Sequence, residues 1–111
     1  MIDWDRVAEL REEIGPEDFG EIVDLFVTEV SAAIEELHRT PPHPKAVEEQ
    51  MHFLKGAALN LGFADLVAIC REGEERAAAG DPFAVTAAQV RDSFERSRDE
   101  FLETLPRRFA A

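Results

Sequence analysis

A chain of 111 residues is long enough to fold as one domain around its own hydrophobic core, and its net charge of −12 excludes several classes of partner. Nucleic acid and anionic membrane surfaces are excluded because both need a basic footprint on the protein. The single cysteine, the lack of 18 consecutive apolar residues and the acidic first residues argue against a disulfide scaffold, a membrane span and a signal peptide, so we expect one cytoplasmic domain over residues 1–111.

Proline and glycine divide the chain into five predicted helices, of which the first two cover residues 3–14 and 16–39. The first is short, with Asp3 or Asp5 as its N-cap, and its narrow apolar stripe suggests a lid on a bundle. The second repeats apolar residues at spacings of three and four from Phe19 to Leu37, a pattern that only a helix satisfies.

Three further helices are predicted over residues 44–61, 65–79 and 82–105. The third is expected to end at Gly62 in a left-handed cap, and its buried stripe consists of Val47, Met51, Leu54, Ala58 and Leu61. The inward residues of the fourth are Leu66, Ile69, Cys70, Gly73 and Ala77. The fifth opens at Asp81-Pro82 and buries Phe83, Ala87, Val90, Phe94, Ser97, Phe101 and Leu105, and residues from Pro106 onward are predicted to form a loosely held tail.

The predicted elements define an all-α fold. Short connections force helices that follow one another in the sequence to be neighbours, so the four long helices should pack as an antiparallel up-down four-helix bundle with a short extra N-terminal helix. Charge is spread unevenly over this bundle: residues 1–36 carry −10, residues 72–111 carry −3, and residues 37–71 carry +1. The middle third is therefore the region that does not repel an anion.

His52 lies in this middle third, within the run His52-Phe53-Leu54-Lys55-Gly56. Residues three and four apart share a helix face, so Lys55 and Gly56 lie beside the imidazole of His52, which should stand at the rim of the buried stripe. A neutral imidazole is a nucleophile near pH 7, and a cation one turn away neutralises charge on a transferred phosphoryl group. A glycine in the middle of a helix costs stability, which suggests that its lack of a side chain gives access to the site.

This run resembles the signature of histidine-containing phosphotransfer (HPt) domains, in which a His-x-x-Lys-Gly element lies on one helix of a four-helix bundle. The resemblance covers about residues 50–75 and extends to Asn60-Leu61-Gly62 and to a pattern on the next helix formed by Leu66, Cys70 and Glu74. The sequence departs from the family at two positions where many members carry serine or another small residue, Ala57 and Ala58.

The resemblance implies that His52 is a phosphoacceptor, on Nε2, with Lys55 stabilising the phosphoryl group and Gly56 giving access. It implies a shuttle from an aspartyl phosphate on one response-regulator receiver domain to an aspartate on another, with Mg²⁺ supplied by the receiver and a hybrid histidine kinase upstream. The surrounding surface, with Glu48, Phe53, Leu59 and Phe63, is expected to dock the receiver. Gln50 either hydrogen-bonds near the site or faces solvent.

No nucleotide-binding loop and no cluster with metal-ligand spacing is found in the sequence, so we expect a phosphocarrier without an ATP site rather than an enzyme, and no bound cofactor or metal. The three histidines show no known ligand spacing, which makes surface positions the better interpretation of His38 and His43. Cys70 is best interpreted as a small buried hydrophobe.

Three other functions stay open at the level of sequence. The first is a receiver- or kinase-docking module of the same fold that is never phosphorylated. The second is the dimerisation and phosphoacceptor part of a histidine kinase, although that family usually continues from its histidine with an acid, and here Phe53 follows. Four long helices complete a bundle in one chain, so we expect a monomer. The third is a small acidic helical adaptor unrelated to signalling.

Overall fold

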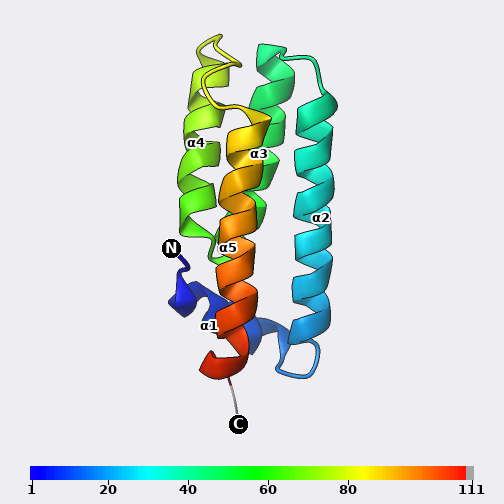
Figure 1. Cartoon of the computed structure of the whole chain (residues 1–111), viewed down its shortest axis with the longest axis vertical. Coiled ribbons are helices and arrows are strands. Elements are labelled where there is room, and N and C mark those ends of the chain that lie inside the picture. Colours follow the sequence, from blue (N-terminus) through cyan, green and yellow to red (C-terminus); the bar gives the residue numbers. More distant parts are fainter. Residues whose placement is uncertain (110–111) are drawn as a thin grey trace.

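The computed structural model describes residues 1–109 and contains five helices: α1 (Trp4–Ile14), α2 (Phe19–Arg39), α3 (Pro44–Leu61), α4 (Ala64–Ala78) and α5 (Ala87–Arg108). Four long helices stand side by side in an elongated bundle, and α1 lies across one end of it (Figure 1). The molecule measures 49 × 22 × 20 Å along its principal axes. The prediction of an all-α four-helix bundle with a short extra N-terminal helix is confirmed.

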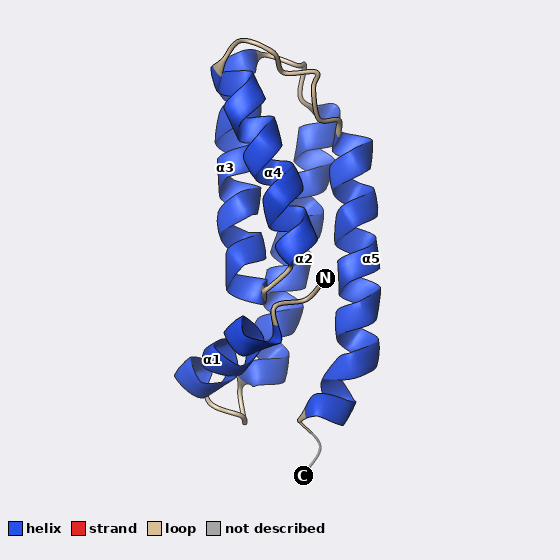
Figure 2. Cartoon of the chain, turned by 90° about the vertical axis from the view of Figure 1, so that its left-hand side faces the viewer, coloured by secondary structure: helices blue, strands red, loops and turns tan. Residues whose placement is uncertain are grey.

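The four long helices form a closed ring, in which α2 packs on α3, α3 on α4, α4 on α5 and α5 again on α2. The view from the side shows short loops joining α2 to α3 and α4 to α5 at one end of the bundle, with α1 at the other (Figure 2). The whole predicted stripe of α3 is buried, at 5% exposure or less, because its spacing keeps these side chains toward the ring centre. This burial fixes the rotation of α3 and hence which of its residues reach the surface.

The α3–α4 contact is the most extensive in the ring, and Gly73 lies in it against Met51. A Cβ built on Gly73 would lie 2.8 Å from Sδ and 2.9 Å from Cε of Met51, which is fully buried on α3. The absence of a side chain at the inward position 73 therefore lets α3 and α4 approach closely. The turn between these helices is equally tight, since Gly62 adopts the left-handed conformation (φ 75°) and a Cβ there would lie 2.6 Å from the backbone oxygen of Asp3.

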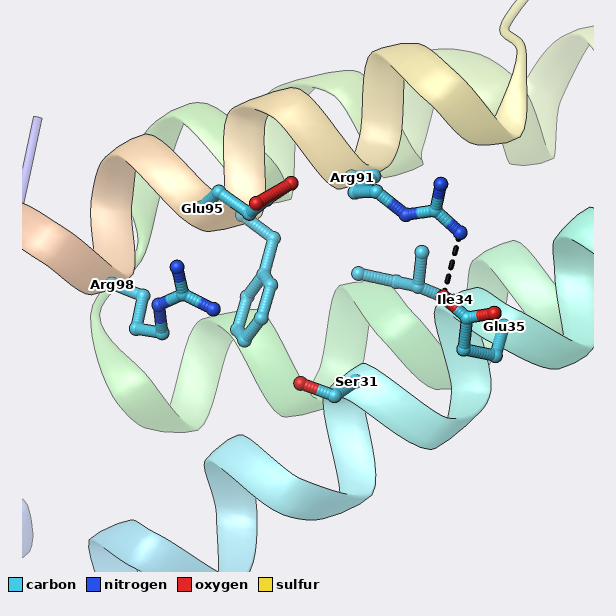
Figure 3. A pocket seen from close by; sticks show the side chains of 7 residues that line it. Ser31, Ile34, Glu35, Arg91, Glu95 and Arg98 are labelled. Atoms are coloured by element: carbon cyan, nitrogen blue, oxygen red, sulfur yellow. Dashed lines mark hydrogen bonds and ion pairs between the residues drawn. The ribbon is translucent and has the colours of Figure 1, made fainter.

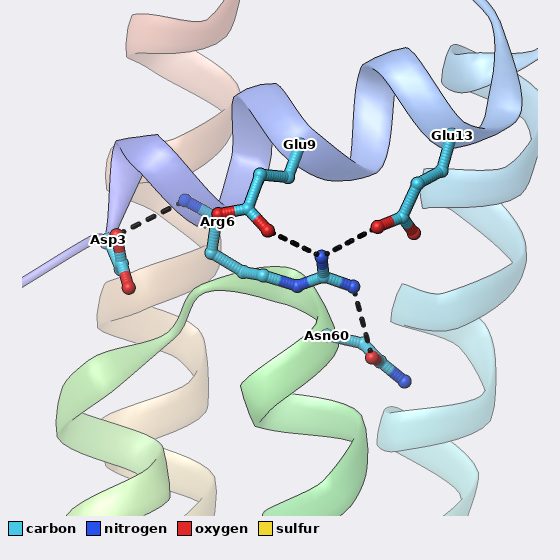
Figure 4. Close-up of polar contacts among 5 residues, drawn as sticks. All are labelled: Asp3, Arg6, Glu9, Glu13 and Asn60. Carbon is cyan, nitrogen blue, oxygen red and sulfur yellow. Dashed lines mark hydrogen bonds and ion pairs between the residues drawn. The ribbon is translucent and has the colours of Figure 1, made fainter.

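Helix α1 is held against this turn by backbone and side-chain contacts. Asp3 caps the helix through its side chain, and its backbone N–H donates to the Gly62 carbonyl at 2.7 Å. Figure 4 shows Arg6 reaching from α1 to α3: its guanidinium bonds Asn60 Oδ1 at 3.3 Å and Glu13 Oε1 at 3.2 Å. With Val7 fully buried beneath it, α1 closes the end of the bundle as a lid.

The faces of the ring are also joined by polar contacts. Arg91 Nη2 of α5 lies 2.7 Å from Glu35 Oε1 of α2 (Figure 3). Within α5, the Arg98 guanidinium lies over the Phe94 ring, 5.6 Å from its centroid. Glu95 lies between these two arginines along α5. This face is formed by the two helices that flank α3 and α4 in the ring, so it is separate from the face on which α3 meets α4.

Two predicted helix starts are wrong. Helix α2 begins at Phe19 rather than Pro16, because Gly15 takes a positive φ of 99° and residues 16–18 complete a turn. Helix α5 begins at Ala87 rather than residue 82, because Thr86 and Gln89 form a capping box that starts it. Phe83, predicted to be buried, is 69% exposed in the connection.

The predicted C-terminal tail is also wrong for the residues that the structure describes. Helix α5 continues through Pro106 to Arg108, where a proline removes a single backbone hydrogen bond near the end of the helix. Phe109 then packs edge-on against Phe19, with ring centroids 6.2 Å apart, and the guanidinium of Arg108 lies 4.8 Å from the Trp4 ring centroid. Residues 110–111 of the predicted tail lie outside the described residues. Helix α4 ends at Ala78, one residue earlier than predicted.

Candidate functional site

His52 lies near the middle of α3 with its side chain 70% exposed, while its stripe neighbours Met51 and Leu54 are fully buried. The expected position at the rim of the stripe is therefore confirmed. Lys55 and Gly56 follow on the same face one turn later, as the helical spacing predicts. The imidazole can thus be reached from solvent while the helix that carries it is fixed by the core.

A carboxylate from the neighbouring helix joins His52 and Lys55. Glu74 of α4 places Oε2 2.7 Å from Nδ1 of His52 and Oε1 2.5 Å from Nζ of Lys55. The Lys55 and Glu74 side chains are only 23% and 19% exposed, in contrast to the imidazole. The close approach of α3 and α4 at Gly73, the residue before Glu74, brings this carboxylate within reach.

The two contacts determine the charge of the carboxyl group. The hydrogen bond from Lys55 lowers the pKa of Glu74 below its ordinary value of 4.5, and the hydrogen bond to His52 acts in the same direction, while desolvation opposes both. Glu74 is therefore a carboxylate at neutral pH and can only accept hydrogen bonds. It follows that Nδ1 of His52 carries the proton, so in the neutral imidazole Nε2 has a free lone pair.

Gly56 faces open space: a Cβ built there would meet no atom within 4 Å. Close packing between helices therefore does not explain this glycine within the described chain. The glycine used for close packing is Gly73. At position 56 a side chain would project from the surface beside His52, where it would contact only a molecule that binds to this face.

Two of the residues expected to dock a partner are large apolar side chains on the surface of α3. Phe53 is 52% exposed and Leu59 is 48% exposed. Glu48, one turn before His52, is partly buried. The prediction that Phe63 docks a partner is wrong. Phe63 is fully buried at the start of α4, with its ring centroid 5.5 Å from that of Phe101. It belongs to the core because the Gly62 turn directs it inward.

Gln50 takes neither of the roles considered for it. Its Nε2 donates to Thr40 Oγ1 at 2.8 Å, which ties α3 to the end of α2, and its Oε1 is buried without a hydrogen-bond partner among the described residues. Gln50 therefore lies on the α2 side of α3, whereas Glu74 approaches His52 from the α4 side.

Cys70 is a small buried hydrophobe, as predicted. It is fully buried, and burial, with the nearby charge of Glu74, raises its pKa to about 12, so it is a neutral thiol at pH 7. Within residues 1–109, no three histidine, cysteine or acidic side chains gather as a metal site. Across the same residues, no helix is both long and apolar enough to cross a membrane.

The fold and the face around His52 agree with a comparison of the sequence with protein families. The Hpt domain family matches residues 21–107, from the first turns of α2 almost to the end of α5. The chain therefore belongs to the HPt domain family, whose members are phosphocarriers of two-component phosphorelay signalling that interact with receiver domains and kinases. Helix α1 lies outside the matched residues. Searches with the whole chain found no match among curated individual proteins or solved structures.

Sequence reasoning missed the contacts of Glu74. The pattern that Glu74 forms with Leu66 and Cys70 does not indicate which side chains Glu74 contacts. A stronger signal was present, since Glu74 follows the buried Cys70 by four residues and Gly73 by one. An acid at the edge of a closely packed helix face has to lie against the neighbouring helix, which here is α3.

Proposed function

We propose that this protein is a cytoplasmic phosphorelay intermediate in which Nε2 of His52 accepts a phosphoryl group from the aspartyl phosphate of one receiver domain and passes it to an aspartate of a second. One observation carries the proposal. The imidazole, whose side chain is 70% exposed, is held at Nδ1 by a carboxylate 2.7 Å away, so in the neutral ring Nε2 is the nitrogen with the free lone pair.

The transfer step follows from this arrangement. The Nε2 lone pair attacks the phosphorus, an N–P bond forms, and the P–O bond to the receiver aspartate breaks, with its electron pair leaving on the aspartate carboxylate. The imidazole keeps its Nδ1 proton and becomes positively charged. Glu74, 2.7 Å from that nitrogen, stabilises the new charge, and the reverse sequence delivers the phosphoryl group to the second receiver.

Lys55 supplies the positive charge for the phosphoryl oxygens. Its Nζ lies on Glu74 in the unphosphorylated protein, at 2.5 Å, and its flexible stem lets it turn toward a group on Nε2 one turn away. In this proposal the receiver domain supplies both the Mg²⁺ and the aspartyl phosphate. The receiver is itself phosphorylated by a hybrid histidine kinase.

In this proposal the protein is a monomer, and the surface around His52 is suited to docking a receiver domain. Phe53 and Leu59 offer exposed apolar area, Glu48 adds a charge, and Gly56 leaves the surface flat beside the imidazole. A flat approach matters because the receiver aspartate must bring its phosphorus within about 3–3.5 Å of Nε2 before the bond can form.

The test is transfer of ³²P from a panel of receiver domains, labelled with acetyl phosphate in the presence of Mg²⁺, to the native protein and to His52→Gln. The variants His38→Gln and His43→Gln are matched controls, because each removes a histidine beside the α2–α3 connection, outside the contacts of His52, Lys55 and Glu74. We expect acid-labile label on the native protein and on both controls, and none on His52→Gln. Absence of label from every receiver, with binding retained, would instead identify an unphosphorylated docking module.

A further inference from the structure

A groove lies between α2 and α3 on the side of Phe53 away from Glu74. It has a volume of about 300 Å³, and its lining residues are Ala33, Glu36, Ala46, Glu49, Gln50 and Phe53. Two alanine methyl groups and the half-exposed phenylalanine ring provide apolar walls, and two carboxylates add negative charge. Neither the phosphoryl chemistry at His52 nor the packing of the core uses this groove.

Most of the polar groups that line the groove are hydrogen-bond acceptors. Glu49 is exposed and forms no ion pair within residues 1–109, while Glu36 shares its charge with Arg39 at 2.9 Å. The Nε2 of Gln50 already donates to Thr40 and its Oε1 is buried, so the acceptors that an occupant can reach are the carboxylates of Glu36 and Glu49. An occupant that suits these groups has an aliphatic part for the walls and a positively charged donor for the acceptors.

We propose that the groove takes a lysine or arginine side chain of the receiver domain and thereby contributes to the choice of receiver. The methylene groups of that side chain pack on Phe53 and the alanines, and its charged end pairs with Glu49. The inference rests on the proposed function, because Phe53 directly follows the phosphoacceptor in sequence and makes the groove continuous with the surface around His52. The net charge of −12 favours a basic partner surface in the same way.

The test uses the receiver that transfers label fastest in the panel described above. The rate of transfer is measured against receiver concentration for Glu49→Lys, for Ala46→Trp, which fills the groove without changing charge, and for Glu95→Lys. The last is a matched control, since it makes the same change of charge on the α2–α5 face (Figure 3). The midpoint of urea unfolding verifies that each variant is folded.

We expect Glu49→Lys and Ala46→Trp to raise the half-saturating receiver concentration by about tenfold while the maximal rate stays within about twofold of native, because docking changes and the chemistry does not. Glu95→Lys should leave both quantities near native. Replacing the receiver's surface lysines and arginines one at a time by glutamate should then restore transfer to Glu49→Lys at one position.

Equal effects of Glu49→Lys and Glu95→Lys, or no receiver substitution that restores transfer, would overturn the inference while leaving transfer to His52 intact. Loss of the proposed function has a different signature, in which the native protein itself receives no label. In that case the groove is tested by binding alone, from the dissociation constants of the same variants for the receiver of the panel that binds the native protein most tightly.

Discussion

Replacing Gly56 by alanine should stabilise the protein and impair phosphotransfer at the same time. Alanine is more favourable than glycine in a helix interior by about 1 kcal/mol. The structure adds no penalty to this gain, because a Cβ at position 56 would meet nothing within 4 Å. We therefore expect the free energy of unfolding to rise by about 0.5–1 kcal/mol. The added methyl group projects beside the imidazole, where the receiver must approach, so transfer should slow.

Gly73→Ala is the matched contrast on the neighbouring helix. Its Cβ would lie within 3.1 Å of three atoms of the buried Met51, and overpacking of this kind costs about 1–3 kcal/mol, which offsets or exceeds the gain in helix propensity. Urea unfolding followed by circular dichroism at pH 7 measures both variants, and the ³²P assay measures transfer. A destabilised Gly56→Ala variant would refute the open environment of Gly56. A stabilised variant that transfers at the native rate would refute its role in access.

Four further predictions concern the carboxylate, the thiol and the core. Glu74→Gln should slow transfer by about tenfold, because the ring loses the carboxylate that orients it. The pKa of Glu74 is lowered in the folded protein, so the stability that its carboxylate contributes is full above about pH 4.5 and is lost as the pH falls through the lowered pKa. The difference in unfolding free energy between the native protein and Glu74→Gln should therefore shrink as the pH falls below about 4.5. A difference that stays constant would contradict the contact with Lys55. Cys70 should react with a thiol reagent only on unfolding, and fast labelling of the native protein would argue against its burial. Leu54→Ala should cost about 2–5 kcal/mol in urea unfolding, and a smaller loss would show that this position is not in the core.

The sequence predicted the helices well wherever burial alone decides their position. The stripe of α3 repeats strictly, and all its members are buried, so the exposure of His52 beside Met51 followed directly. The start of α5 failed because proline at position 82 looked like a helix start, whereas the capping box of Thr86 and Gln89 is the stronger signal.

Contacts between helices were the part that could not be predicted. Phe63 was predicted to lie on the surface around His52, but the left-handed Gly62 turns the chain inward before it. Gln50 and Glu74 needed knowledge of which helix lies on each side of α3. Periodicity gives the buried face of a single helix and leaves its neighbours undefined.

The central claim is that Nε2 of His52 carries the phosphoryl group while Nδ1 keeps its proton and donates it in a hydrogen bond to Glu74. The measurement that tests it most directly is NMR of the ¹⁵N-labelled imidazoles before and after transfer from a phosphorylated receiver. We predict that the neutral imidazole of the free protein carries its proton on Nδ1, and that ³¹P couples to Nε2 of His52 after transfer. Phosphorus on Nδ1, or on His38 or His43, would contradict the account.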